Sequence, residues 1–318
     1  MVVQYTFKRI VHMVVILLGV TFLTFALTSM SPSDAAEMTL SRQGVAPTAE
    51  LLEATREKMG LHDPFIIQYV NWLKGVLQGD FGTSFQHGDT VFAQMSRRIP
   101  QTIKLTLLST GVMIIFALPL GILSAIYKNK PIDYIIRFTS FIGIAMPNFW
   151  LGLILMLVFG VMKQWLPVMS DGSLKSSILP VATLAIPMIC RYARQIRVAI
   201  LEEMSSEYVI GARARGVKEL DIILKNVLPN CVLPVITLLG LSIGGLLGGT
   251  AIIESIFSWP GVGRMAIDAI TVRDYPVIQA YVIWMTIIYV FINLGVDLLN
   301  TLLDPHKSTG GRKKYAEL

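Results

Sequence analysis

The sequence predicts an all-α polytopic membrane protein with six transmembrane helices and with both termini in the cytoplasm. Of its 318 residues, 53% are hydrophobic and only 15% are charged, whereas soluble domains usually carry about 25% charged residues. The mean hydropathy is +0.62. This composition excludes intrinsic disorder and disfavours a soluble enzyme. Both cysteines, Cys190 and Cys231, lie in apolar stretches, so no disulfide framework is expected.

Six runs are long and apolar enough to cross a bilayer, whose core of about 30 Å needs roughly 20 residues of helix. They cover residues 10–28, 105–127, 138–162, 176 to about 197, 231–253 and 275–296. The first run is longer than the apolar core of a signal peptide, so we expect a retained helix. The expected parts are a tail and first helix (1–30), an extracytoplasmic segment with short helices (31–104), a five-helix core (105–306) containing a cytoplasmic loop (201–230), and a cytoplasmic tail (307–318).

The distribution of basic residues gives the orientation, because Lys and Arg collect in short cytoplasmic loops. One side of the predicted bundle carries Lys8, Arg9, Lys128, Lys130, Arg137, Arg191, Arg194, Arg197, Arg213, Arg215, Lys218, Lys225, Lys307, Arg312, Lys313 and Lys314. The short loops on the opposite side carry only Lys163, Lys175, Arg264 and Arg273. The net charge of +6 is therefore explained by cytoplasmic loops rather than by nucleic-acid binding.

The long extracytoplasmic segment is predicted to be an ordered surface of mixed charge. Residues 50–59 form a helix capped by Thr48 and stopped by Gly60, and residues 69–77 form a short amphipathic helix that contains Trp72. We expect a lid or docking surface here rather than an independent domain.

Prolines interrupt several spans, namely Pro119, Pro147, Pro180, Pro187 and Pro234. Each removes a backbone donor and permits a kink, which either serves ordinary packing or lines a cavity. Met146-Pro147-Asn148 breaks the third run, and both Met146 and Asn148 are pathway or gate candidates.

Loop 201–230 is patterned as a helix, a turn and a second helix. Ser205 or Ser206 caps a helix over 207–215, and Gly216 supplies the turn. The second helix has an apolar face and is closed by Pro229; this face consists of Leu220, Ile223, Leu224, Val227 and Leu228. The segment either lies on anionic lipid as a basic amphipathic surface or projects from the membrane to bind a cytoplasmic partner.

The spacing Ala212-x-x-x-Gly216, followed after eleven residues by Leu228-Pro229, resembles the cytoplasmic loop motif of ABC importer permeases. The motif's leading Glu is absent, as in the dipeptide, oligopeptide and nickel branch of that family. Further similarities to that branch occur at residues 60–64, 68–69, 79–82, 146–150, 208–216, 254–261, 273–276 and 304–305. Residues 47–56, 164–167 and 248–254 are most similar to the nickel-import permease B subunit.

The resemblance implies the type I importer fold and a role in importing nickel or a nickel or metal chelate, or alternatively dipeptides or oligopeptides. It also implies a bacterial cytoplasmic membrane location, a second permease subunit, two cytoplasmic ATPase subunits and an extracytoplasmic substrate-binding protein. The loop would contact the ATPase through a coupling helix, whose expected residues are Glu207, Tyr208, Ala212, Arg213, Ala214, Arg215, Gly216, Leu228 and Pro229.

The fifth run and the residues directly after it contain the remaining pathway or gate candidates, which are Ser242, Gly244, Gly245, Gly248, Glu254 and Trp259. Glycines at four-residue spacing, beginning at Gly240, permit close helix approach, either within the chain or against a partner permease along the pathway. Glu254 is an acid near a span, which fits a loop-anchoring hydrogen bond or an outer gate.

The sequence lacks motifs that would indicate an enzyme. The chain has no phosphate-binding loop, so ATP and Mg²⁺ would bind to partner subunits, and we expect no cofactor on this chain. The four histidines lie at no metal-ligand spacing; they are His12, His62, His87 and His306. An intramembrane enzyme would need paired catalytic groups in the spans, and a passive channel would not need the patterned loop.

Overall fold

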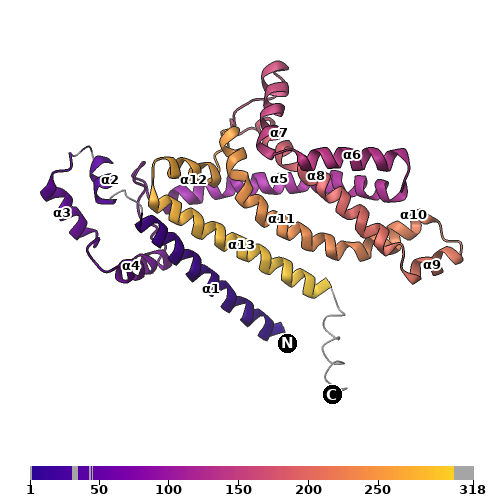
Figure 1. The fold of residues 1–318 in the computed structure, drawn as a ribbon, viewed down its shortest axis with the longest axis horizontal. Coiled ribbons are helices and arrows are strands. Elements are labelled where there is room, and N and C mark those ends of the chain that lie inside the picture. The colour runs from indigo at the N-terminus through magenta and orange to yellow at the C-terminus, as the bar shows by residue number, and fades with distance from the viewer. Residues whose placement is uncertain (1, 31–34, 43, 45, 304–318) are drawn as a thin grey trace. The chain divides into compact units, whose positions relative to one another are not determined.

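The computed structural model describes residues 2–30, 35–42, 44 and 46–303. The expected cytoplasmic tail (307–318) and the Asp304-Pro305 motif lie outside the described residues. Within the described part of the chain the structure is helical, with one isolated β-bridge between Thr83 and Thr90 (Figure 1). The elements are α1 (Val2–Ser29), α2 (Ala35–Arg42), α3 (Ala49–Lys58), α4 (Phe65–Leu77), α5 (Val91–Ile126), α6 (Pro131–Ala145), α7 (Asn148–Leu155), the π-helix η1 (Met156–Met162), α8 (Leu174–Glu203), α9 (Glu207–Ala214), α10 (Glu219–Ile222), the π-helix η2 (Ile223–Val227), α11 (Leu228–Ile256), α12 (Val262–Thr271) and α13 (Tyr275–Leu303).

The expected all-α membrane fold is confirmed. Among the described residues, four helical stretches are apolar and long enough to span a bilayer: Val11–Ser29, Val91–Ile126, Leu174–Glu203 and Tyr275–Leu298. The pair α6 and α7–η1 adds a fifth if a bent pair is counted as one span. The expected run 231–253 lies within α11, a continuous 29-residue helix, several of whose side chains lie outside the described residues.

The third expected run, 138–162, is interrupted at the predicted place, Met146-Pro147-Asn148, and its first helix begins earlier than expected, at Pro131. Two helices, Pro131–Ala145 and Asn148–Met162, meet at an angle of 102°. The break occurs at Met146, whose extended backbone (φ −80°, ψ 128°) is the conformation that a following proline favours. Pro147 then lacks the amide hydrogen that would continue the first helix.

The chain divides into two compact units. One comprises Met1–Thr102 with Pro260–Val290, and the other comprises Ile103–Trp259 with Phe291–Leu318. In the first unit, an aromatic cluster joins α1 to α4: Phe25 lies 5.4 Å from Phe65 and 5.2 Å from Trp72 between ring centroids. A second cluster packs Val91 and Met95 of α5 against α12 and the start of α13.

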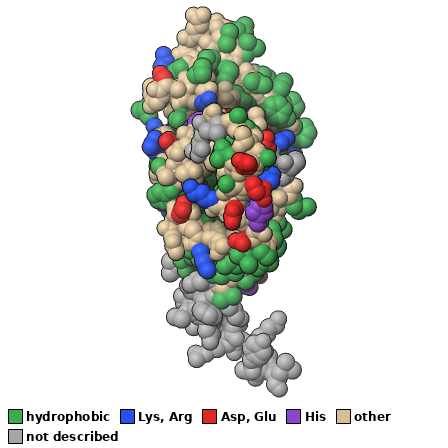
Figure 2. All heavy atoms as spheres, turned by 90° about the vertical axis from the view of Figure 1, so that its left-hand side faces the viewer, with side chains coloured by type: hydrophobic (Ala, Val, Ile, Leu, Met, Phe, Trp, Pro, Cys, Tyr) green, Lys and Arg blue, Asp and Glu red, His purple; other side chains and the backbone are tan. Residues whose placement is uncertain are grey.

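The helices of segment 31–104 largely follow the sequence prediction. The Thr48 side chain accepts a hydrogen bond from the Leu51 amide, and Gly60 follows α3 with a φ of +65°. The second helix begins earlier than expected, at Phe65 rather than Tyr69. Figure 2 shows acidic and basic side chains interspersed at the end of the molecule that bears α2 and α3, which agrees with the expected mixed charge.

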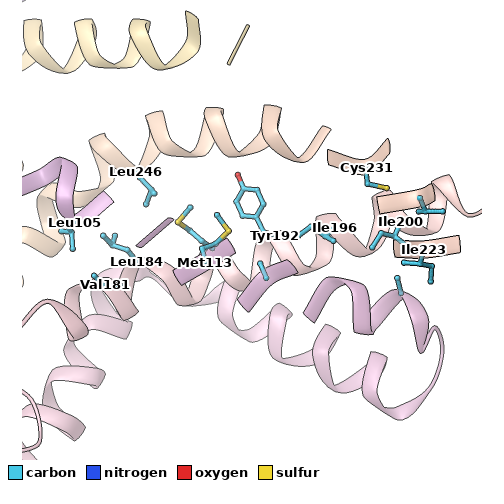
Figure 3. Packing of buried hydrophobic residues seen from close by; sticks show 14 of the residues in the cluster. Leu105, Met113, Val181, Leu184, Tyr192, Ile196, Ile200, Ile223, Cys231 and Leu246 are labelled. Carbon is cyan, nitrogen blue, oxygen red and sulfur yellow. The ribbon is translucent and has the colours of Figure 1, made fainter. Parts of the chain in front are cut away.

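The core of the second unit is built around α8, which contacts α6, α7, α11 and η2. Its buried face contributes to one hydrophobic cluster that extends from the loop after α8 to Trp259 at the end of α11. Figure 3 shows labelled side chains of this cluster pointing toward one another, including Leu184, Tyr192 and Ile196 of α8, Met113 of α5 and Leu246 of α11.

Glycines on neighbouring helices allow them to approach α8 closely. A methyl group added at Gly121 of α5 would lie 2.7 Å from Ile196, and one at Gly143 of α6 would lie 2.4 Å from the Cys190 sulfur. At Gly152 of α7 the corresponding distance to Thr183 is 3.1 Å. Small residues at helix crossings are the usual means of tight packing in membranes.

We predict that Gly121→Ala lowers the stability of the protein by about 1–3 kcal/mol, because the added methyl group overpacks the crossing of α5 and α8. Gly111→Ala is the matched control in the same helix, since a methyl group there meets no atom within 4 Å. The control should be neutral or stabilising by up to about 1 kcal/mol, the helix-propensity gain. Thermal unfolding of the two purified variants makes the comparison, and equal melting temperatures would contradict the packing argument.

Candidate functional site

Loop 201–230 forms the expected short helix and turn. α9 runs from Glu207 to Ala214, one residue shorter than predicted, and Gly216 follows with a φ of +77°. The Gly216 amide donates to the Arg213 carbonyl at 2.9 Å, and the Val217 amide donates to the Ala212 carbonyl at 3.2 Å. This pair of bonds is a Schellman motif, which requires the left-handed conformation that glycine adopts without strain.

One face of α9 is buried. Val209 is fully buried and Ala212 is 5% exposed, and both belong to the cluster that includes Ile200 of α8. Ile222, Ile223 and Val227, on the returning segment, belong to the same cluster. The helix is therefore fixed to the hydrophobic core rather than attached by a free linker.

Polar contacts join α9 to both helices that flank the loop. The Tyr208 hydroxyl donates to the Glu203 carboxylate at 2.8 Å. The Asn230 amide nitrogen lies 3.2 Å from the same carboxylate oxygen and 3.1 Å from the Tyr208 hydroxyl. Partial burial and the Glu203 carboxylate raise the pKa of the Tyr208 phenol, so it remains a donor at neutral pH. The three residues link α8, α9 and α11.

An ion pair bridges the Gly216 turn. The Arg213 guanidinium donates two hydrogen bonds to the Glu219 carboxylate, at 2.6 and 3.1 Å. The hydrogen bond from Arg213 lowers the pKa of Glu219, so the pair remains ionised well below neutral pH. Because both side chains are about half exposed, the pair contributes at most about 1 kcal/mol and acts mainly to set the angle of the turn.

The second helix of the loop differs from the prediction in two respects. Pro229 does not close it, because α11 begins at Leu228 and the proline occupies the first turn, where no amide donor is needed. A short α10 and the π-helical η2 precede α11 without a break. The wider turn of η2 rotates the buried face to Ile222, Ile223 and Val227, so that Leu220 and Leu224 are exposed (55% and 45%) rather than buried.

The exposed surface of the loop combines basic and apolar side chains. Glu207, Arg213, Ala214 and Arg215 are exposed on and directly after α9, and Ile210 is 58% exposed. We call this set, together with Leu220 and Leu224, the outer loop face. A rigid helix that presents exposed apolar groups among charges has the composition of a protein docking surface.

The glycines of α11 separate into two environments. A methyl group at Gly240 would collide with Val296 of α13, so this glycine serves packing within the chain. At Gly245 and Gly248 a methyl group would meet no atom within 4 Å, whereas Gly244 is buried. Ser242 accepts a hydrogen bond from the Tyr192 hydroxyl at 2.5 Å, which ties α11 to α8.

The remaining gate candidates lie near the ends of helices. Glu254 is fully buried near the end of α11, and its carbonyl accepts the Trp259 amide at 2.8 Å. Trp259 is 2% exposed and has the Lys104 ammonium 5.9 Å from its ring centroid. Met146 is half-buried at the break after α6, and Asn148 is exposed at the first position of α7.

Family profiles match almost the entire chain. The profile described as "Binding-protein-dependent transport system inner membrane component" matches residues 117–309, and the profile of the corresponding N-terminal component matches residues 2–106. The chain belongs to this family of ABC importer permeases.

Its relatives span the full length of the permease. The oligopeptide transport system permease protein AppB of Bacillus subtilis is 39% identical over 312 residues, covering 95% of this chain and 98% of that protein. The metal-staphylopine import system permease protein CntB of Staphylococcus aureus is 36% identical over 97% of this chain and 99% of its own length. The glutathione transport system permease protein GsiC of Salmonella typhi is 35% identical, with 95% and 98% covered.

A solved structure agrees on the fold. The MetNI methionine ABC transporter, in an inward-facing conformation, aligns with a TM-score of 0.56 at 16% identity and covers 66% of this chain and 96% of that chain. Membership of the family makes the permease a multi-pass inner-membrane subunit of an importer whose ATPase is a separate partner. An importer of this family also has a partner permease and a substrate-binding protein.

Two buried carboxylates of the permease were not predicted from the sequence. Asp133, in the first turn of α6, is fully buried and accepts hydrogen bonds from Arg197 at 2.7 Å and from the Ser124 hydroxyl at 2.6 Å. Asp274 is 1% exposed and accepts the Ser84 hydroxyl at 2.5 Å. The available signals were an acidic residue two positions after the helix-initiating Pro131 and the family-like segment 273–276, to which no role was assigned.

We predict that Tyr208→Phe loosens the loop by about 1 kcal/mol, the net value of a typical hydrogen bond. Amide hydrogen exchange over residues 203–216 of the permease should then accelerate roughly fivefold if it proceeds by local opening. Tyr289→Phe serves as the control, because Tyr289 is 45% exposed and makes no hydrogen bond to the described residues through its hydroxyl. Unchanged exchange in Tyr208→Phe would show that the contact does not hold α9.

Proposed function

We propose that this chain forms half of the translocation pathway of an ABC importer and that α9 is its coupling helix, seated in a groove of a cytoplasmic ATPase subunit. The observation that carries the proposal is the rigid attachment of α9. The Schellman turn, the buried residues Val209 and Ala212, and the contacts of Tyr208 all hold it against the flanking helices.

The proposed mechanism is alternating access. ATP and Mg²⁺, bound by the partner subunits, close the ATPases and displace the two coupling helices. Because one packed cluster extends from Val209 to Trp259, a displacement of α9 moves α8 and α11 as a body instead of being absorbed by a flexible joint. The cavity between the two permeases would then open alternately to either side of the membrane.

The expected coupling residues take distinct parts in this proposal. Those of the outer loop face, Glu207, Arg213, Ala214 and Arg215, would meet the ATPase. Tyr208, Ala212 and Gly216 would hold the helix in place, as would the start of α11 at Leu228 and Pro229. In the competing interpretation, the same surface lies on anionic lipid. That interpretation predicts no loss of ATPase coupling when the turn at Gly216 is altered.

The pathway would run beside α11. Gly245 and Gly248, which face open space in this single chain, are placed to contact the partner permease or line the cavity. Ser242 and Gly244 lie on the same helix, while Glu254, Trp259, Met146 and Asn148 are the proposed outer gate. A buried glutamate near a span end is compatible with either a gate or a structural anchor.

We predict that Gly216→Val abolishes uptake and transport-coupled ATP hydrolysis while membrane insertion stays intact. A β-branched residue in the left-handed region strains the backbone by about 1–2 kcal/mol. The chain relieves this strain by changing the direction of α9. Uptake and ATP hydrolysis are measured in liposomes that contain the permease with its partner subunits.

The matched control is Gly172→Val. Gly172 has a similar φ of +82° and open space around it, but it lies in the loop before α8, on the side opposite the coupling loop. This variant should retain uptake. Normal uptake and coupled hydrolysis in Gly216→Val would overturn the coupling assignment.

For the cargo, we propose nickel or a nickel or metal chelate, with dipeptides or oligopeptides as the alternative. The metal-chelate proposal is supported by the similarity to CntB and by the resemblance of residues 47–56, 164–167 and 248–254 to the nickel-import permease B subunit. The alternative draws on AppB and GsiC, whose names specify oligopeptides and glutathione. Metal carried inside a small chelator would need no metal-ligand group on this chain.

The cargo proposal predicts that a nickel chelate, presented with the cognate binding protein, stimulates ATP hydrolysis by the reconstituted importer. Free nickel and a set of di- to pentapeptides are measured in parallel. Stimulation by peptides alone would reject the metal chelate and establish the alternative, while leaving the coupling assignment unaffected.

A further inference from the structure

A groove between α6 and α8 has no part in the proposed transport mechanism. We propose that it binds the headgroup phosphate of an anionic phospholipid from the cytoplasmic leaflet, with the acyl chains lying along α6. The groove encloses about 540 Å³ and is lined by side chains of these two helices alone.

Three arginines supply the charge of the groove. Arg137 comes from α6, and Arg194 and Arg197 come from α8. Arg197 is neutralised by Asp133, which accepts from its guanidinium at two positions, each at 2.7 Å. Neither Arg137 nor Arg194 pairs with a carboxylate among the described residues. The groove therefore carries two uncompensated positive charges.

The Asp133 pair also positions the site. Since Asp133 is fully buried and additionally accepts the Ser124 hydroxyl and the Asn129 amide, it fixes Arg197 and the start of α6 relative to α8. Arg137 lies over the Tyr134 ring, with 5.6 Å between its guanidinium carbon and the ring centroid. A guanidinium ordered in this way binds phosphate oxygens in a fork of two hydrogen bonds.

The groove continues into an apolar surface. Phe138 is 65% exposed, Phe141 is 70% exposed, and Val198, across the groove on α8, is 43% exposed. Phe141 lies one helical turn beyond Arg137, about 6 Å farther along α6. Charge at one end and exposed hydrocarbon at the other match a phospholipid, whereas a free anion would leave the apolar part unused.

The position of the groove along α6 and α8 indicates the leaflet from which the phospholipid would come. α6 begins at Pro131, directly after the basic connection that contains Lys128 and Lys130, which the charge distribution places on the cytoplasmic side. Arg137 lies less than two turns into α6, at the depth where a basic side chain reaches the headgroups. Basic pockets between helices on this side of a membrane bind anionic headgroups.

The test uses the complete importer in nanodiscs and measures binding of phosphatidylglycerol against phosphatidylcholine. Arg137→Gln combined with Arg194→Gln removes both uncompensated charges but leaves the Asp133–Arg197 pair intact. Each arginine near an anionic lipid surface strengthens binding by a factor of about five. Loss of both should therefore weaken phosphatidylglycerol binding by the double variant roughly 30-fold. Phosphatidylcholine binding should not change.

Arg191→Gln is the matched control, since Arg191 is an exposed arginine on α8 that does not line the groove. It should retain the full preference for phosphatidylglycerol. The proposal is overturned if the double variant binds phosphatidylglycerol normally or if Arg191→Gln loses as much affinity.

Two further measurements exclude other occupants. Inorganic phosphate should not displace phosphatidylglycerol, and effective displacement would identify a simple anion site instead of a lipid site. A photoreactive phenylalanine at position 141 should label lipid, and labelling of the partner permease alone would show that a protein helix covers the groove and would reject the proposal.

Discussion

The arrangement of the second unit depends on the packing of α8. Helices in a bilayer gain no hydrophobic advantage from associating with each other, so close contact between small residues must hold them together. Gly121, Gly143 and Gly152 remove side chains where α5, α6 and α7 cross α8, and the buried face of α8 fills the space. The same helix continues to Glu203, and α9 begins shortly after it, at Glu207. One element thus carries both the membrane core and the attachment of the proposed coupling helix.

Polar interactions reinforce this packing near the C-terminal end of α8. Asp133 joins α6 to α8 through Arg197, and Glu203 joins α8 to α9 through Tyr208. A buried carboxylate with several donors is costly to separate from them, so the Asp133 contact favours movement of α6 and α8 as a unit. The Glu203 contact is exposed to solvent and is therefore a weaker link between α8 and α9. Arg137 and Arg194 lie beside one of these contacts without a carboxylate partner among the described residues. A bound anionic lipid would therefore adjoin the helix that we propose transmits motion from the ATPase.

Much of the proposed site could be predicted because its signals are local. Glu207 and Gly216 marked a short helix and a left-handed turn, since helix ends and glycine conformation depend on a few neighbouring residues. Ser206 takes the N-cap position, but its side chain makes no capping hydrogen bond. The second helix was predicted less well. The orientation of Leu220 and Leu224 followed from an assumed α-helical period, and the wider η2 changed it. No local residue preference distinguishes a π-turn from an α-turn there, because its stability comes from the contacts of Ile223 and Val227 with the core.

By itself, the sequence determined that the chain is a helical membrane protein, because a bilayer requires long apolar segments whose backbone groups bond within the helix. It also determined the family, through motifs spread over nearly the whole chain. The tertiary structure decided what depends on contacts between distant segments. It bent the third run by 102° at Met146, paired Asp133 with Arg197 across 64 positions, and separated Gly240, which packs against Val296, from the open Gly245 and Gly248. Sequence spacing gives the face of a helix on which a residue lies, but only the neighbouring helix determines what meets it.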